Sequence, residues 1–206
     1  MKRRFQRFLC LIVGPIMRAL FGLREINSPR LEGSYILAPN HTSFIDPLVV
    51  QLTHRRHVTF LMDGPIFRQP AMNWFFRFWG AIPIPAARVV AGALKSALKT
   101  IRSGEVVAIF PEGRISPDGS LKDGKAGVAM LMLKARVPVV PVAIFGTRGV
   151  LPRWARFPRP GRVLVVYGEP IPPTLDPEDK KDAARELAAQ VMESISGLQA
   201  RFAKRA

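Results

Sequence analysis

The chain has 206 residues, and 48% of them are hydrophobic, which is enough for one domain with a full core and argues against a disordered or fibrous protein. Its single cysteine, Cys10, excludes a disulfide framework or a cysteine metal site within one chain. Lysine and arginine outnumber aspartate and glutamate by 31 to 15, a formal charge of +16, and this excess predicts a polyanionic partner such as an anionic lipid or a nucleic acid.

Residues 1–24 combine basic and apolar side chains in the pattern of an interfacial membrane anchor. An apolar run over residues 8–17 is flanked by basic side chains, which are Lys2, Arg3, Arg4, Arg7 and Arg18. The run is shorter than the roughly 20 apolar residues that a spanning helix needs, and Gly14-Pro15 is expected to interrupt it. We therefore expect a monotopic helix that lies on an anionic membrane surface, at the cytoplasmic face. A secretory signal and a helix packed on the core are the alternatives.

From residue 33 onward, short β-rich runs alternate with helical spacing of apolar residues. This pattern predicts an α/β domain over residues 25–206, with a central mixed sheet flanked by helices. The expected strands are 34–38, 58–62, 81–84, 105–110, 139–145 and 163–167, and the expected helices are 44–52, 66–79, 89–102, 127–135 and 179–202. Residues 151–162 hold prolines and arginines around Trp154 and Phe157, and they predict either a loop that lies on a membrane or an ordinary irregular loop.

The sequence Asn-His-Thr-Ser-Phe-Ile-Asp-Pro at 40–47 stands where an apolar strand ends and a helix begins, the usual place for a site in α/β folds. If the helix starts near Ser43, the Asp46 carboxylate lies close enough to accept the imidazole N–H of His41. The pair would then fix one tautomer and leave the other ring nitrogen free to take a proton. The alternative is a helix cap by Thr42 or Ser43 beside a structural histidine.

A second motif, Phe-Pro-Glu-Gly-Arg-Ile-Ser at 110–116, follows another apolar strand. Arg114 offers a planar fork for phosphate oxygens, and Gly113 lets the backbone approach a ligand. Glu112 is expected to bind a substrate hydroxyl or to hold Arg114 in place. Alone, the motif would also suit an ordinary turn, but together with the first it indicates a functional site.

The two motifs in this order resemble those of the glycerophospholipid acyltransferase family, which includes lysophosphatidate acyltransferases. Gly-Ala-Ile-Pro-Ile at 80–84 resembles the family's Gly-x-Ile-x-Ile block, and Val-Pro-Val-Val-Pro-Val at 137–142 resembles its Val-Pro-x-x-Pro-Val block. The resemblance extends from residue 31 to about residue 172, and it implies the α/β acyltransferase fold.

Two departures concern the acceptor. Lysophosphatidate enzymes of the family typically have Glu-Gly-Thr-Arg, whereas residues 112–115 are Glu-Gly-Arg-Ile; Ala86 stands where a basic residue usually closes the Gly-x-Ile-x-Ile block, with Arg88 two places on. Together with Ser120 and the Asp-Gly-Lys-Ala-Gly sequence at 123–127, this form resembles the acyltransferase domain of 2-acylglycerophosphoethanolamine acyltransferase. The implied acceptor is therefore lysophosphatidate or lysophosphatidylethanolamine.

The resemblance implies transfer of a fatty acyl group from acyl-CoA or acyl-carrier protein to the free hydroxyl of a lysophospholipid, in phospholipid biosynthesis or remodelling. It makes His41 the general base and Asp46 its partner. No Gly-x-Ser-x-Gly elbow is present, so Ser43 is expected to be a cap and not a nucleophile. The residues expected to bind substrate are Glu112, Gly113, Arg114, Lys125 and Arg88, with Arg114 as the first choice for the phosphate. Neither a metal nor a bound cofactor is implied.

The other histidines, His54 and His57, stand in a basic stretch and are expected at the surface or facing a membrane, because two side chains are too few for a metal site. A group of large apolar side chains either lines a slot for the acyl chain or belongs to the core, and the core is the simpler interpretation. The group comprises Met62, Met72, Trp74, Phe75, Phe76, Phe78 and Trp79.

Three other functions are alternatives. A non-enzymatic lipid-binding protein would use the charge and residues 1–24 but not His41. An acyltransferase could act on an amino-lipid without glycerol, because the deviating motifs are the ones that bind substrate. A nucleic-acid binder is favoured by the charge alone, yet no helix-turn-helix, zinc or RNA-recognition signature accompanies it, so no nucleic-acid partner is expected.

Overall fold

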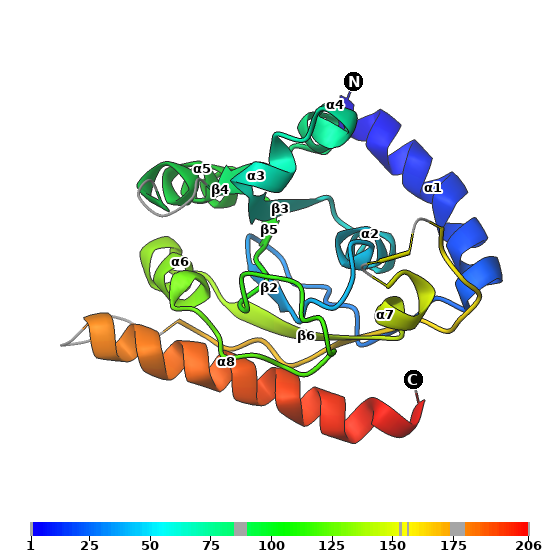
Figure 1. Cartoon of the computed structure of the whole chain (residues 1–206). Helices are drawn as coiled ribbons and strands as arrows, with labels where there is room; N and C mark the ends of the chain where they lie inside the picture. Colours follow the sequence, from blue (N-terminus) through cyan, green and yellow to red (C-terminus); the bar gives the residue numbers. More distant parts are fainter. Residues whose placement is uncertain (1, 85–89, 153, 156, 174–179, 206) are drawn as a thin grey trace.

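The computed structural model describes residues 2–84, 90–152, 154–155, 157–173 and 180–205. A seven-stranded sheet forms its centre, with helices on both faces (Figure 1). The strands are β1 (Arg24–Ile26), β2 (Ile36–Pro39), β3 (Val58–Asp63), β4 (Ile82–Ile84), β5 (Val106–Ala108), β6 (Val139–Phe145) and β7 (Leu164–Tyr167). The helices are α1 (Lys2–Phe21), α2 (Asp46–Thr53), α3 (Gly64–Phe67), α4 (Pro70–Trp79), α5 (Val90–Arg102), α6 (Gly127–Ala135), α7 (Thr147–Val150), α8 (Lys180–Phe202) and the 3-10 helix η1 (Ala203–Arg205).

The strand order is β1-β7-β6-β2-β5-β3-β4, and every neighbouring pair is parallel except β6 and β7. The predicted mixed sheet is therefore confirmed. In the middle, Ile36 of β2 is in register with Val107 of β5 on one side and with Val139 of β6 on the other. Because parallel strands end at the same edge of a sheet, the segments that follow β2, β5 and β6 meet there, and the two sequence motifs come together.

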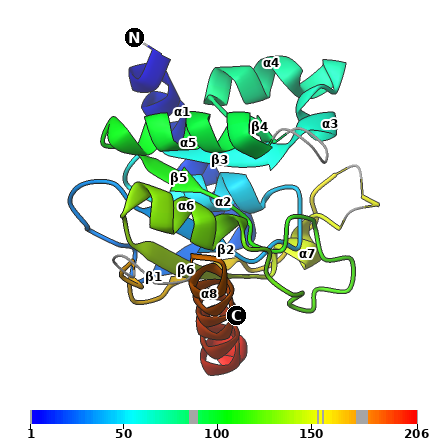
Figure 2. The ribbon, with the colours of Figure 1, turned by 90° about the vertical axis from the view of Figure 1, so that its left-hand side faces the viewer.

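The strands alternate their side chains between two cores, as β2 illustrates. Leu37 belongs to a cluster that includes residues of α1 and α2, whereas Ile36 belongs to one that includes residues of α5, α6 and α8. Figures 1 and 2 show these two sets of helices on opposite faces of the sheet. The α3–α4 pair lies at the β4 end, where α3 contacts both β3 and β4.

The six expected strands and the expected helices form with their ends within two residues of prediction, apart from one helix that is divided. The helix expected over 66–79 is two helices, α3 and α4, because Gln69 precedes a proline and takes ψ near 121° instead of a helical value. The strand β1 and the helix α7 were not predicted. Each has only three or four residues, which is too few to show a period.

The helix α1 does not break at Gly14-Pro15, so that prediction was wrong: α1 is continuous over 20 residues. A proline leaves the carbonyl four residues earlier without its helical donor, here that of Leu11. Both Pro15 and Leu11 are exposed, so water can satisfy this carbonyl. On the inner side, Met17 and Phe21 are buried in the core that contains α2. No helix in the described ranges has the length and apolar content to cross a membrane.

The expectation that the aromatic residues of α4 belong to the core was also wrong. None of the side chains of α4 is buried, Met72 is partly exposed and Trp74 is largely exposed. The helix instead touches α1, where Phe5 packs edge-on against Phe78 and the side-chain N–H of Gln6 donates to the Phe78 carbonyl at 2.6 Å.

His54, which was expected at the surface, is buried with 5% of its area exposed. Its Nδ1 lies 2.9 Å from the carbonyl oxygen of Arg56 and its Nε2 lies 2.7 Å from the hydroxyl of Tyr35. The backbone nitrogen of Arg56 is farther from Nδ1, at 3.2 Å, and the shorter contact to the carbonyl oxygen, which can only accept, assigns the proton to Nδ1, so that Nε2 accepts from Tyr35. Burial lowers the pKa of His54 below its ordinary value. His57 is half-buried, beside the ring of Trp79.

Candidate active site

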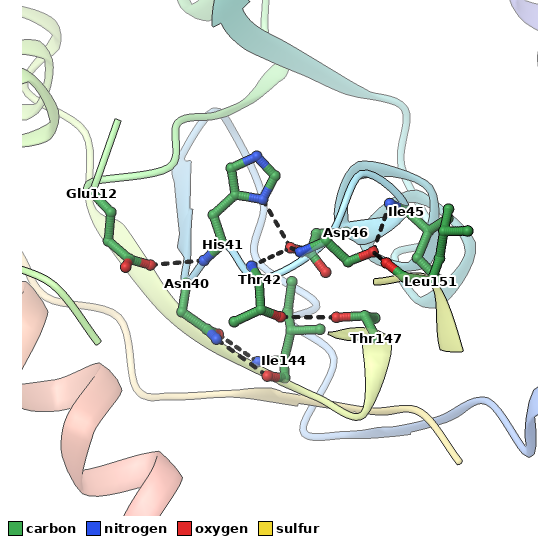
Figure 3. Close-up of polar contacts among 10 residues, drawn as sticks. Asn40, His41, Thr42, Ile45, Asp46, Glu112, Ile144, Thr147 and Leu151 are labelled. Carbon is green, nitrogen blue, oxygen red and sulfur yellow. Dashed lines mark hydrogen bonds and ion pairs between the residues drawn. The ribbon is translucent and has the colours of Figure 1, made fainter. Parts of the chain in front are cut away.

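His41 and Asp46 lie in the turn that joins β2 to α2, and they are hydrogen-bonded (Figure 3). His41 Nδ1 is 2.8 Å from Asp46 Oδ2, and that oxygen also accepts the backbone N–H groups of Thr42 at 2.7 Å and Ser43 at 2.8 Å. Asp46 is fully buried at the first residue of α2, where the helix dipole favours a negative charge. The hydrogen bonds from Thr42 and Ser43 therefore fix the carboxylate beside His41 and also stabilise the turn.

The imidazole of His41 is oriented from two sides. Because the carboxylate accepts, Nδ1 carries the proton, and Nε2 of the neutral ring keeps its lone pair for another partner. The ring stacks on Phe110, with 3.9 Å between the centroids and 20° between the planes, and 15% of the His41 side chain remains exposed. A substrate hydroxyl would thus meet a histidine with a fixed tautomer and a fixed ring plane.

The Glu112 carboxylate accepts backbone N–H groups from two segments, the turn after β2 that contains His41 and the loop between β5 and α6. Its Oε1 accepts the N–H of His41 at 2.8 Å and its Oε2 accepts the N–H of Lys122 at 3.1 Å. Burial raises the pKa of the Glu112 carboxyl, and the two N–H groups oppose this effect. The loop is tied to the turn a second time, because the N–H of Ser116 donates to the His41 carbonyl at 2.8 Å. Both carboxylate oxygens of Glu112 are thus occupied by N–H groups of the chain itself.

Gly113, Arg114 and Lys125 form an exposed basic corner beside this turn. Gly113 has φ of +68°, and a Cβ placed on it would lie 2.7 Å from Lys125 Nζ. The Lys125 backbone N–H donates to the Pro111 carbonyl at 2.8 Å, which holds the lysine next to the glycine. Among the described residues, neither Arg114 nor Lys125 forms an ion pair, so both charges can meet an anion. Arg88 and Ala86 lie outside the described residues.

Sequence reasoning did not identify the contribution of Asn40. Its side-chain oxygen accepts the N–H of Ile144 at 2.6 Å and its side-chain N–H donates to the Ile144 carbonyl at 3.2 Å (Figure 3). Asn40 is buried, so these bonds fix the end of β2 against β6. The signal available was an asparagine beside the histidine at the end of an apolar strand, but its partner is 104 residues away.

The contacts of α7 and of the residue after it with the His41 turn were not predicted either. The hydroxyl groups of Thr42 and Thr147 are 3.0 Å apart, and the Ser43 hydroxyl donates to the Leu151 carbonyl at 2.7 Å. Ser43 is not a helix cap, contrary to expectation: α2 begins two residues later than expected and has no side-chain cap. Arg148, also on α7, lies against the loop at Gly119, where an added Cβ would be 3.3 Å from Arg148 Cδ.

The described residues contain no group of three or more His, Cys, Asp or Glu side chains that could hold a metal ion. The arrangement instead combines an oriented imidazole, a buried carboxylate and exposed cations at the carboxyl edge of a parallel sheet. These are the parts needed to take a proton from a hydroxyl group beside an anionic ligand.

Comparison with known proteins gives the family. The Acyltransferase family model matches residues 22–145, more than half of the chain, and the chain belongs to this family. The matched region contains His41, Asp46 and the 110–116 motif.

Several curated relatives are named as acyltransferases. The chain is 28% identical over 177 residues to the chloroplastic 1-acyl-sn-glycerol-3-phosphate acyltransferase BAT2 of Brassica napus, which covers 82% of this chain and 51% of that protein. It is 24% identical over 156 residues to 1-acyl-sn-glycerol-3-phosphate acyltransferase of Bacillus subtilis, covering 73% of this chain and 74% of that protein. The chain spans about half the length of the chloroplastic relatives that it matches.

A solved structure has the same fold. The crystal structure of the 1-acyl-sn-glycerophosphate acyltransferase PlsC from Thermotoga maritima superposes with a TM-score of 0.71 at 23% identity. The superposition covers 97% of this chain and 83% of that chain, so the likeness includes α1 as well as the sheet.

Proposed function

We propose that the protein transfers a fatty acyl group from a thioester to the free hydroxyl of a lysophospholipid, with 1-acyl-sn-glycerol-3-phosphate as the first candidate acceptor. The observation that carries this proposal is the oriented His41–Asp46 pair within the region matched by the Acyltransferase family. The names of the relatives support the choice of acceptor.

In this proposal His41 is the general base. Its Nε2 takes the proton of the acceptor hydroxyl while the oxygen attacks the thioester carbonyl carbon, and the new C–O bond replaces the C–S bond. The proton then passes from Nε2 to the departing sulfur, so no atom is gained or lost. General-base catalysis contributes roughly 10²–10⁴-fold, and Asp46 contributes by keeping Nδ1 protonated and stabilising the imidazolium.

The acceptor phosphate binds at the basic corner, with Arg114 as its main partner and Lys125 as a second one. Both side chains are exposed and adjoin Gly113, whose missing Cβ leaves room for Lys125 Nζ. Arg88 is a further candidate from the sequence. Glu112 acts as a positioning residue, because each of its oxygens accepts a backbone N–H of the site.

Residues 1–24 serve as a membrane-interfacial segment, and residues 25–206 as the acyltransferase domain. Support comes from the outer side of α1, where large apolar side chains are exposed, namely Phe5, Phe8, Leu11, Ile12, Ile16 and Leu20. An apolar stripe with lysine and arginine near its start suits a peripheral location on an anionic membrane surface, at the cytoplasmic face.

A second acceptor, lysophosphatidylethanolamine, is favoured by one specific observation. The arginine follows Gly113 directly, as in the acyltransferase domain of 2-acylglycerophosphoethanolamine acyltransferase, and not one place later. An amino-lipid without glycerol is a third candidate acceptor. For each of the three acceptors, the proposed acyl donor is acyl-CoA or acyl-carrier protein.

An acyl-transfer assay tests the proposal. Purified protein in detergent would be given labelled acyl-CoA or acyl-carrier protein together with lysophosphatidate, lysophosphatidylethanolamine, lysophosphatidylglycerol or a lyso-amino-lipid. We expect a new ester with lysophosphatidate. If product forms only with one of the other acceptors, that lipid replaces lysophosphatidate as the acceptor, and the proposed reaction stands. Tight binding of the lipids without product from any donor would favour the non-enzymatic lipid-binding protein.

A further inference from the structure

Residues 151–162 carry the two most exposed aromatic side chains in the described part of the chain. Phe157 is 79% exposed and Trp154 is 71% exposed. The guanidinium of Arg159 lies over the Trp154 ring, 4.4 Å from its centroid. The sequence of this segment contains arginines and no acidic residue. Residues 153 and 156 lie outside the described part of the chain.

The segment is attached to the candidate site at its beginning. The Ser43 hydroxyl donates to the Leu151 carbonyl at 2.7 Å, so the turn that holds His41 is bonded to the first residue of the segment. The N–H of Arg159 donates to the carbonyl of Val150, the last residue of α7, at 2.7 Å. The exposed aromatic side chains are therefore carried on a loop whose base is part of the site.

The end of the segment is attached to α1. The N–H of Val163 donates to the carbonyl of Phe21, the last residue of α1, at 2.9 Å. Figure 1 shows the yellow segment running from α7 to the end of α1. The end of α1, whose exposed apolar side includes Ile16 and Leu20, is thus joined to the end of the segment that carries the exposed aromatic residues.

We infer that Trp154 and Phe157 form a second lipid-contacting element, which enters the membrane interface beside the site while Arg159 binds anionic headgroups. Tryptophan suits the headgroup region because its ring is apolar and its indole N–H is polar. The apolar phenylalanine ring suits the acyl-chain boundary below, and arginine suits anionic headgroups. A lipid surface fits better than a protein partner, because two side chains cover far less than the roughly 800 Å² per partner of a specific protein interface. This inference rests on the membrane association proposed for α1.

The consequence concerns the acceptor. A loop that is bonded to the His41 turn and rests in the headgroup layer holds that turn at the depth where a lysophospholipid presents its hydroxyl. A lipid acceptor would then reach His41 without leaving the membrane interface.

Fluorescence of Trp154 tests this directly in the full chain. Trp74 and Trp79 would be replaced by phenylalanine, which leaves Trp154 as the only tryptophan, and the protein mixed with vesicles of phosphatidylcholine and phosphatidylglycerol, with and without brominated acyl chains. We expect a blue shift of the Trp154 emission and quenching by the bromine atoms. Co-sedimentation without any response of Trp154 would overturn the inference and leave the role of α1 intact. Absence of binding to the vesicles would overturn both.

A matched pair of variants tests the contribution of Phe157. Phe157→Glu places a charge where the ring would enter the lipid, and we expect a roughly tenfold lower vesicle partition coefficient. Ser196→Glu adds the same charge at an exposed position of α8, on the opposite face of the sheet, and is expected to bind like the wild-type protein. Equal partition coefficients for the two variants would overturn the inference. Neither measurement depends on acyl transfer, so the outcome is separate from that of the proposed function.

Discussion

The backbone N–H of His41 donates to Oε1 of Glu112 at 2.8 Å, across 71 residues of sequence. The bond joins the segment after β2 to the segment after β5, and the other oxygen of Glu112 extends the link to Lys122. The motifs at residues 40–47 and 110–116 are therefore one structural unit, because Glu112 of the later motif fixes the backbone of His41 in the earlier one.

Replacing Glu112 by glutamine tests this link. A glutamine side chain has only one oxygen, so either the His41 or the Lys122 N–H would lose its acceptor, and an unpaired buried N–H costs about 1–3 kcal/mol. We expect a lower free energy of unfolding in urea and a lower kcat, with the KM for lysophosphatidate nearly unchanged. Glu169→Gln, at an exposed position, is the control. A normal kcat with a raised KM would mean that Glu112 contacts the acceptor.

Gly113→Ala tests the packing of Lys125. The new methyl group would meet Lys125 Nζ, and φ of +68° would add backbone strain of about 1–2 kcal/mol. Because the lysine must move, we expect a higher KM for phosphate-bearing acceptors. Gly33→Ala is the matched control, since Gly33 has φ of +71° and no atom within 4 Å of its built Cβ. The control should share the loss of stability but keep the KM; equal KM values for both variants would contradict the assignment of Lys125.

Arg114→Ala removes the main partner proposed for the phosphate. A hydrogen bond to a charged group contributes about 1.5–3 kcal/mol, which corresponds to a KM roughly 10- to 150-fold higher for lysophosphatidate. The kcat at saturation should change little, because the arginine binds the acceptor and does not move its proton. Steady-state kinetics over a range of acceptor concentrations measures both constants. A loss confined to kcat would place Arg114 at the reacting atoms instead.

His54 makes the stability of the fold depend on pH. Burial lowers its pKa in the folded protein, so the unfolded chain takes up the proton first, at about pH 6.5. The stability from neutral His54 is thus fully present above that pH and is lost as the pH falls toward the folded pKa, at up to about 1.4 kcal/mol per pH unit. We expect His54→Gln to reduce this slope in urea unfolding between pH 7 and pH 5. Equal slopes for wild type and His54→Gln would refute the buried neutral state.

Local patterns predicted much of this structure. In most helices and strands the apolar residues recur at the spacing typical of that element. His41 and Asp46 are close enough along the chain for their hydrogen bond to be anticipated. The bonds of Asn40 to Ile144 and of Glu112 to His41 could not be anticipated, because they join groups 104 and 71 residues apart whose positions depend on the order of the strands.

Burial was the less predictable property. The apolar spacing of α4 is the same for a helix against a core and for one that faces outward, and only the place of α4 beyond the end of the sheet distinguishes the two. His54 stands among arginines, yet the side chain of Arg56 reaches the carbonyls of Gly33 and Gly104 at the surface while the histidine points inward. The direction of a side chain depends on the fold and not on the polarity of its neighbours.

The role of His41 as the base of an acyl transfer can be measured by the rate constant of acyl transfer to lysophosphatidate, with the variants His41→Asn and His57→Asn compared side by side. Both variants remove one imidazole and keep a polar side chain, but only His41 is bonded to Asp46. We expect a loss of roughly 10²–10⁴-fold for His41→Asn, no material change for His57→Asn, and cooperative unfolding by both proteins. A folded His41→Asn protein that transfers acyl groups at the wild-type rate would show that His41 is not the base.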